Sequence, residues 1–344
     1  MKKRLFSLFL ICLLLTGCAF PGLSQPTSAG KKYTATFLDV FDTVTTIVGY
    51  DESKEAFEEK TRAIHDALLR YHQLFDIYNS YEGIVNLKDV NDAAGGAPVQ
   101  VDAAVMALLN DCKTYYDLTD GKVNVAMGSV LRLWHEARED AFDDPANAYL
   151  PDEQALRQAL DHTDFSCVVL DEAASTVQIT DPQLRLDVGA VAKGWSVQKV
   201  AENAPSGLLI SVGGNVCATG PKDESGTPWV VGITDPNGGD YLHTIETADQ
   251  SVVTSGDYQR YFVVDGKMYH HIIDPATLYP GKLWRSVTIV CGDSGLADAL
   301  STALFLLDYE QGLALLEQCD AEAFWIDQEN GRYYSPGFQD LIRT

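Results

Sequence analysis

Cysteine is scarce in this chain and follows none of the spacings that bind zinc. The 344 residues include seven cysteines, and no two of them form a Cys-x-x-Cys pair. The five in the body of the chain are an odd set, which cannot pair completely: Cys112, Cys167, Cys217, Cys291 and Cys319. These features argue against a zinc cage and a full disulfide framework. We expect most of these side chains to be small buried apolar groups.

Basic residues are also few. Lys and Arg number 25 against 49 Asp and Glu, which gives a formal net charge of −24 at pH 7. Proteins that bind nucleic acid by neutralising its phosphates need the opposite balance, so this class is excluded. A phosphate-bearing small molecule would have to be held by a local group of donors or by a cation.

Long apolar runs are missing except near the N-terminus. Leu5–Leu15 is apolar but too short to span a bilayer, and three basic residues precede it. The segment ends in Leu15-Thr16-Gly17-Cys18, which resembles the lipobox of bacterial lipoproteins. The alternative is an ordinary signal peptide with an incidental cysteine.

The lipobox resemblance implies a lipoprotein signal peptide over residues 1–17 and a diacylated Cys18. Residues 18–33 have the composition of a tether, and residues 34–344 are long enough for one large domain or two intimate lobes. Two acyl chains anchor a protein stably. We therefore expect an extracytoplasmic protein of a bacterial cell envelope, attached to the membrane by lipid.

Strands and helices alternate irregularly along the body of the chain. Apolar residues at helical spacing predict helices at 53–73, 102–116, 152–160, 192–203 and 296–307, with a short one around 130–134. β-Branched and alternating segments predict strands at 34–50, 167–171, 176–180, 207–212, 229–233, 243–247, 251–254, 261–264, 268–270 and 286–291. The acidic, proline-containing segment 136–150 is predicted to be a surface loop.

The stretch Leu186–Trp195 is the most informative in the chain. An apolar run that carries Asp187 is interpreted as a strand, which leads through a small-residue turn into a helix. Backbone N–H groups at the start of a helix favour an anion, small residues allow a ligand to approach, and Lys193 adds a positive charge. The stretch suits a phosphate or pyrophosphate, although a tight turn with a surface lysine gives the same pattern.

Asp298 and Thr302 lie four residues apart on a predicted helix and so share one face. A carboxylate and a hydroxyl are hard oxygen ligands suited to Mg²⁺. A soluble helix often has such a pair merely on its solvent side, so both interpretations stay open.

In order along the chain, these motifs resemble the FAD:protein FMN transferases, the ApbE family of flavin transferases, and the resemblance extends from about Thr34 to Leu307. The matching stretches are Leu186–Gly194, Thr254–Tyr258, His271–Pro275 and Asp298–Ala303, with support from Ser211–Asn215 and Phe41–Thr43.

The resemblance implies an α+β fold of mixed, largely antiparallel sheets flanked by helices, with two intimate lobes and the ligand cleft between them. It implies an enzyme that transfers the FMN half of FAD to a threonine or serine hydroxyl of an acceptor redox protein and releases AMP, with Mg²⁺ as cofactor. Flavin-binding positions carry over as Phe41, Tyr78, Lys122, Val123, Asn124, Asp187, Lys193 and Ile272, and metal ligands as the Ala190 carbonyl, Asp298 and Thr302, with Ser301 adjacent. His271 and Asp257 match positions near the reacting phosphate, and either is a candidate general base.

The chain departs from the family pattern at Asp42, Asn124, Ala126 and Leu278, mostly near the expected flavin contacts. Such changes can favour hydrolysis over transfer. The first alternative is therefore a Mg²⁺-dependent FAD pyrophosphatase that gives FMN and AMP. The second is a non-catalytic lipoprotein that binds a flavin or another solute and has no need of Asp298, Thr302 or His271.

Overall fold

The computed structural model describes residues 30–343. The predicted signal peptide, the lipid-bearing Cys18 and most of the tether lie outside the described residues. Within residues 30–343, no helix has the length and apolar character needed to cross a membrane.

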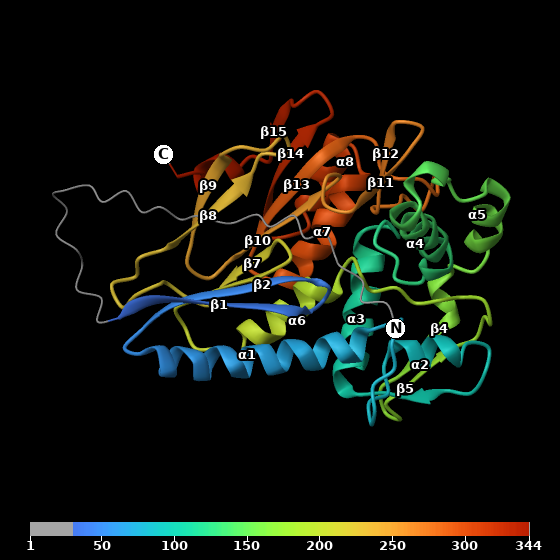
Figure 1. The fold of residues 1–344 in the computed structure, drawn as a ribbon, viewed down its shortest axis with the longest axis horizontal. Helices are drawn as coiled ribbons and strands as arrows, with labels where there is room; N and C mark the ends of the chain where they lie inside the picture. Colours follow the sequence, from blue (N-terminus) through green and yellow to red (C-terminus); the bar gives the residue numbers. More distant parts are fainter. Residues whose placement is uncertain (1–29, 344) are drawn as a thin grey trace.

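An eight-stranded sheet occupies the centre of the molecule (Figure 1), in the order β1-β2-β6-β7-β10-β13-β14-β15. All neighbouring strands are antiparallel. The strands are β1 (Lys31–Val40), β2 (Thr43–Asp51), β6 (Leu208–Val212), β7 (Asn215–Ala218), β10 (Ser251–Gly256), β13 (Trp284–Cys291), β14 (Ala321–Asp327) and β15 (Arg332–Tyr334). Two antiparallel hairpins accompany the sheet: β8 (Trp229–Thr234) with β9 (Tyr241–Thr247), and β11 (Tyr261–Val264) with β12 (Lys267–His270).

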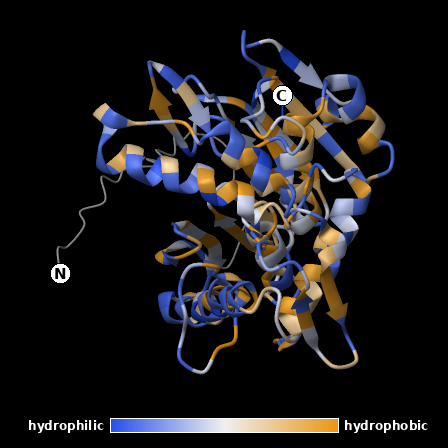
Figure 2. Ribbon diagram, turned by 90° about the vertical axis from the view of Figure 1, so that its right-hand side faces the viewer, coloured by the Kyte–Doolittle hydropathy of each residue, from blue (hydrophilic) through white to orange (hydrophobic). Residues whose placement is uncertain are grey.

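Helices α1 (Lys54–Phe75), α6 (Ala192–Ala201) and α7 (Ser294–Leu306) pack along the sheet, and α8 (Tyr309–Leu316) follows α7. Helices seen in Figure 2 carry both hydrophilic and hydrophobic residues, and α1 buries one apolar stripe that includes Phe57, Ile64 and Leu68. Strand β13 is buried on both faces. Val287 and Ile289 face the core that contains α7, whereas Val290 packs in a second cluster with residues of β8.

A smaller, mainly helical lobe lies beside the sheet (Figure 1). It contains α2 (Leu87–Asp92), α3 (Ala103–Leu118), α4 (Gly128–Asp143), α5 (Glu153–Leu160) and a three-stranded sheet of β3 (Val99–Gln100), β5 (Thr176–Ile179) and β4 (Val168–Asp171). Short 3₁₀ helices lie at Pro145–Asn147, Phe165–Cys167 and Phe338–Leu341. One apolar core joins this lobe to the sheet, since it includes Val105 and Leu186 together with Val287 and Leu304.

The predicted α+β class with antiparallel sheets is confirmed, and the structure corrects two local predictions. Residues 136–143 are helical, because Ala137 and Ala141 continue the buried stripe of α4 that begins with Val130 and Trp134. The run before α6 is not a strand. It makes a single β-bridge between Met127 and Arg185, and its backbone is held elsewhere by a side chain.

Asn91 provides that side chain. Its Oδ1 accepts a hydrogen bond from the Leu186 N–H at 2.7 Å, and its Nδ2 donates to the Leu186 carbonyl at 2.9 Å. The buried amide thus replaces a neighbouring strand. Among the cysteines, Cys112, Cys217 and Cys291 are buried free thiols, and Cys167 and Cys319 are partly buried.

Candidate active site

The start of α6 and the middle of α7 are in direct contact, and this contact brings Lys193 and Asp298 together. The Gly194 N–H donates to Asp298 Oδ2 at 2.8 Å, and Lys193 Nζ lies 3.5 Å from the same oxygen. A Cβ on Gly194 would overlap the Ser294 carbonyl and the Asp298 side chain, so the approach requires glycine. Asp298 is only 4% exposed. The motif therefore places a buried carboxylate next to a lysine.

The predicted metal ligands provide oxygen atoms of three kinds, a carboxylate, a hydroxyl and a backbone carbonyl. Asp298 and Thr302 follow one another on the same face of α7, and Ala190 lies in the turn before α6. Ser301 is fully buried, and its Oγ lies 2.8 Å from both Ser255 Oγ and the Asp298 carbonyl. These internal hydrogen bonds make Ser301 a supporting residue more than a ligand.

This donor set fits Mg²⁺. Among the described residues, no three His, Cys, Asp or Glu side chains form a group that could hold a metal by themselves. Mg²⁺ is usually bound in proteins by one or two carboxylates together with substrate phosphates and water. A ligand set of one buried carboxylate, a hydroxyl and a carbonyl agrees with this usual Mg²⁺ coordination. It differs from a zinc site, which is built from cysteine and histidine ligands.

His271 follows directly after the β11–β12 hairpin, and its ring orientation is fixed. Its backbone N–H donates to the Arg260 carbonyl at 3.1 Å, and its Nδ1 lies 3.2 Å from the same oxygen. A carbonyl can only accept, so Nδ1 carries the proton and Nε2 keeps a free lone pair. Burial, followed by the nearby Arg260 charge, lowers the pKa of His271 from 6.5 to about 3. The imidazole is therefore neutral and able to accept a proton at Nε2.

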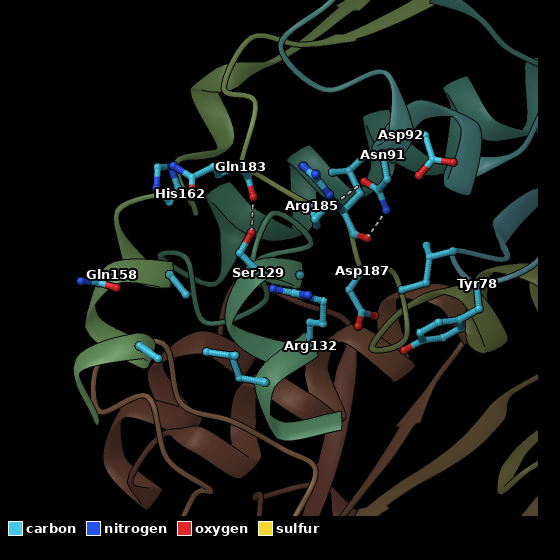
Figure 3. Close-up of a pocket in the computed structure, with 16 residues that line it drawn as sticks. Tyr78, Asn91, Asp92, Ser129, Arg132, Gln158, His162, Gln183, Arg185 and Asp187 are labelled. Carbon is cyan, nitrogen blue, oxygen red and sulfur yellow. Dashed lines mark hydrogen bonds between the residues drawn. The ribbon is translucent and has the colours of Figure 1, made fainter. Parts of the chain in front are cut away.

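Asp187 lies at the edge of a polar cavity of about 520 Å³ (Figure 3). Its carboxylate accepts the Gly189 N–H at 2.9 Å and thereby shapes the turn that leads to α6. Burial raises the pKa of Asp187, while the Gly189 N–H, the His135 ring and the charges of Arg138 and Arg260 oppose that rise. Tyr78 borders the same cavity from the loop after α1.

The ApbE family model matches residues 41–325, most of the described chain. The chain belongs to the ApbE family. The FAD:protein FMN transferase of Treponema pallidum is 37% identical over 278 residues, which cover 75% of this chain and 75% of that protein. The FAD:protein FMN transferase of Klebsiella pneumoniae is 33% identical over 268 residues, which cover 74% and 80% of the two chains.

Solved structures of the family share the fold. The ApbE protein of Thermotoga maritima superposes with a TM-score of 0.81 at 29% identity, covering 91% of this chain and 100% of that one. The flavin transferase ApbE of Vibrio cholerae superposes with a TM-score of 0.74 at 22% identity, covering 91% and 99%. The sheet and the helical lobe are therefore the ApbE architecture.

In this ApbE-family chain, Asp257 has surroundings that do not suit a general base. It is 1% exposed, and its Oδ2 lies 4.0 Å from Nε of Arg285. The same guanidinium donates to the side chains of Asn237 and Asn330. A hydroxyl on another protein cannot reach a carboxylate so enclosed. This burial favours His271 over Asp257 as the base, and the role of Asp257 stays a prediction.

The β1–β2 turn holds Phe41 in a strained conformation. Phe41 and Asp42 have φ values of 54° and 50°, in the left-handed region that favours glycine. The Phe41 N–H donates to His72 Nδ1 at 3.2 Å, and the Tyr81 hydroxyl lies 3.4 Å from His72 Nε2 and donates to Asp76 at 2.7 Å. This chain of hydrogen bonds offsets the strain. Backbone strain of this kind is frequent at ligand sites.

The other predicted flavin-binding positions differ in what they offer. Lys122 pairs with Asp274 at 3.0 Å, and Ile272 is 6% exposed. Val123 is 1% exposed, and the Asn124 side chain is engaged with the Ala126 N–H and the Thr163 carbonyl. Val123 and Asn124 can therefore meet a ligand through their backbone more readily than through their side chains.

His135 and Arg138 are not among the predicted site residues, since the sequence predicts only a short helix around 130–134 and a loop at 136–150. Both residues lie on α4, and Arg138 Nη2 donates to His135 Nδ1 at 2.8 Å. The His135 ring stacks on Tyr78 with centroids 5.0 Å apart and an interplanar angle of 28°. A helical spacing of three between a histidine and an arginine was the signal available in the sequence.

Proposed function

We propose that this chain is an FAD:protein FMN transferase that moves the FMN half of FAD to a threonine or serine hydroxyl of an acceptor redox protein. The relatives bear that name. The observation that carries the proposal is the pairing of two features. Asp298 and Lys193 form a charged centre at the α6–α7 contact, and His271 is held through Nδ1 with a free lone pair on Nε2.

Different residues of the chain accept the proton, stabilise the developing charge and hold the metal. His271 Nε2 accepts the proton of the acceptor hydroxyl as its oxygen attacks the FMN-side phosphorus. The new P–O bond forms while the anhydride bond breaks, and AMP leaves with the bonding electrons. Lys193 and the N–H groups of the turn before α6 stabilise the negative charge that develops. Asp298, Thr302 and the Ala190 carbonyl would hold Mg²⁺, and the bound ion would neutralise charge on the diphosphate.

The flavin and its ribityl chain are expected along Phe41, Tyr78, Asp187, Ile272 and the turn Lys122-Val123-Asn124. We further propose that Cys18 carries the lipid that anchors the enzyme to the outer face of a bacterial membrane, where acceptor redox proteins of the envelope are reached. The apolar segment and lipobox before Cys18 support this location.

The test uses the chain from about residue 25 onward, which omits the predicted anchor. It is mixed with FAD, Mg²⁺ and the flavin-acceptor domain of a membrane redox protein, and intact masses are recorded. We expect the acceptor to gain the mass of FMN minus water. The gain should disappear with EDTA or in Asp298→Ala and persist in Asp320→Ala, where an exposed aspartate is lost.

The alternatives give different products. Free FMN and AMP beside an unmodified acceptor would show a pyrophosphatase, in which water replaces the hydroxyl. Intact FAD that binds without turnover would show a binding protein. Retention of transfer in Asp298→Ala would remove the metal assignment.

A further inference from the structure

Helix α4 presents His135 and Arg138 on the face that meets Tyr78. A guanidinium can only donate hydrogen bonds, so the 2.8 Å contact requires a lone pair on His135 Nδ1. His135 is therefore neutral, with its proton on Nε2. Burial, followed by the Arg138 charge, lowers the pKa of His135 in agreement with this assignment. The neutral ring is a suitable stacking surface for Tyr78.

The charge of Arg138 is poorly neutralised by the protein. Its side chain is only 18% exposed, and its one ion-pair contact within residues 30–343 is with Glu139 at 3.8 Å, a carboxylate that is 52% exposed. An enclosed guanidinium normally forms a bidentate pair with a carboxylate or phosphate. Arg138 instead donates to a neutral histidine, which leaves most of its donors available.

Arg138 lies near the cavity that Tyr78 and Asp187 border, because it donates to His135 and the His135 ring stacks on Tyr78. Arg138, Arg260 and Lys193 all lower the pKa of His271, and Arg138 and Arg260 both favour the ionised form of Asp187. Arg260 forms no ion pair within the described part of the chain, and Lys193 shares its charge with Asp298. This local excess of positive charge occurs in a chain whose formal net charge is −24. Such an arrangement fits a small, highly charged anion.

We propose that Arg138 is a substrate-binding residue that holds phosphate oxygens of the dinucleotide diphosphate, and that His135 positions Arg138 against Tyr78. The inference rests on the proposed function, because it takes FAD as the ligand. It adds α4 to the binding machinery, so that the helical lobe and the sheet both hold the diphosphate.

The test compares FAD with riboflavin, which lacks the diphosphate and the adenosine. Arg138→Gln removes the charge and keeps an amide that can donate to His135. The variant and the wild type are titrated with FAD and with riboflavin in the presence of Mg²⁺, and binding is followed by flavin fluorescence. We expect the dissociation constant of FAD to rise by about 10- to 100-fold, the usual effect of a lost charge-assisted hydrogen bond. Riboflavin binding should change less than about twofold, since it has no phosphate.

Two further variants control the result. Arg157→Gln removes an arginine that is 73% exposed on α5 and should leave both ligands unaffected. Arg138→Lys keeps the charge and should recover most of the FAD affinity, which also shows that the site folds. Equal loss of affinity for FAD and riboflavin would show that Arg138 only supports the structure of the site. Unchanged FAD affinity would show that Arg138 does not contact the ligand.

The two proposals can fail separately. A wild-type protein that binds FAD but modifies no acceptor contradicts the proposed function and still allows the Arg138 comparison. A wild-type protein that does not bind FAD contradicts both.

Discussion

Two adjacent histidines, His270 and His271, differ in function because their ring nitrogens have different partners. His270 is 6% exposed, and both of its nitrogens are engaged, Nε2 with the Gly281 carbonyl at 2.7 Å and Nδ1 with the Ile272 N–H at 3.2 Å. His271 uses only Nδ1. Position in the sequence therefore does not identify the base, whereas a count of free lone pairs does.

The pH dependence of the reaction follows from the lowered pKa of His271. The free enzyme keeps His271 neutral down to a pKa of about 3, so the acid limb of kcat/KM should lie well below pH 6.5. Bound diphosphate favours the imidazolium, so the limb of kcat should lie at higher pH than that of kcat/KM. Both limbs are measured with saturating Mg²⁺ from about pH 8 down to the lowest pH at which the protein stays folded.

A kcat/KM limb near pH 6.5 would contradict this assignment. Asp187→Asn is the control, since the raised pKa of Asp187 gives a second titration on the acid side.

The lowered pKa of His271 also affects the stability of the fold. A folded-state pKa below the unfolded value of 6.5 gives a contribution that is complete above pH 6.5 and is lost as the pH falls below it.

At the scale of elements, the contact between α6 and α7 determines where the charged centre lies. Both helices have small residues at the contact, and Gly194 packs directly on the Ser294 carbonyl and the Asp298 Cβ. This close approach lets a backbone N–H reach the buried carboxylate. The helices must stay at this separation for Asp298 to keep its orientation.

Gly194→Ala is expected to separate the two helices. The added methyl group has no space, and overpacking of this kind costs about 1–3 kcal/mol of stability. The loss should be larger for function, because the Asp298 carboxylate moves with α7. We expect FAD and Mg²⁺ together to stop raising the melting temperature of the variant. Thermal unfolding with and without both ligands measures this.

Gly292→Ala is the matched control, because a Cβ there meets no atom within 4 Å. It should leave stability and the ligand-induced shift nearly unchanged. A Gly194→Ala protein with a normal ligand-induced shift would show that the α6–α7 contact does not govern the site.

Elements with local signals could be predicted from the sequence, and elements that depend on distant partners could not. Ser53 and Asp102 cap α1 and α3 as their side-chain chemistry predicts, accepting from the Ala56 and Ala104 N–H groups. The apolar residues of the segment before α6 alternate, and this pattern predicts a strand. Its actual partner is the Asn91 side chain, 95 residues away, and no local pattern reveals such a bond.

At the scale of the whole molecule, some site residues could likewise be predicted from local sequence patterns, whereas others depend on distant contacts. Lys193 and Asp298 could be found from motifs, because each lies in a short pattern of small residues and charges. The burial of Asp257 against Arg285 and the approach of α4 to Tyr78 depend on how the two lobes pack. No pattern in the sequence predicts that these segments contact each other.

Charge is distributed unevenly over the whole molecule, and salt should therefore act in opposite directions on folding and on binding. The formal net charge of −24 makes the folded chain repel itself, while the cations Arg138, Arg260 and Lys193 attract the diphosphate. Raising NaCl from about 0.05 M to about 0.5 M shortens the Debye length from roughly 14 Å to roughly 4 Å. We expect the free energy of unfolding to rise by on the order of 1 kcal/mol, because screening relieves the repulsion.

Over the same range, the affinity for FAD should fall, because screening weakens the attraction between these cations and the diphosphate. Urea unfolding and FAD titrations at both salt concentrations measure the two effects, with riboflavin as the uncharged control. A fall in stability with salt would mean that attractive surface pairs outweigh the net repulsion. A salt-independent FAD affinity would mean that the cations around His271 do not meet the phosphates, since attraction between charged groups at a partly open site must weaken when the solvent screens it.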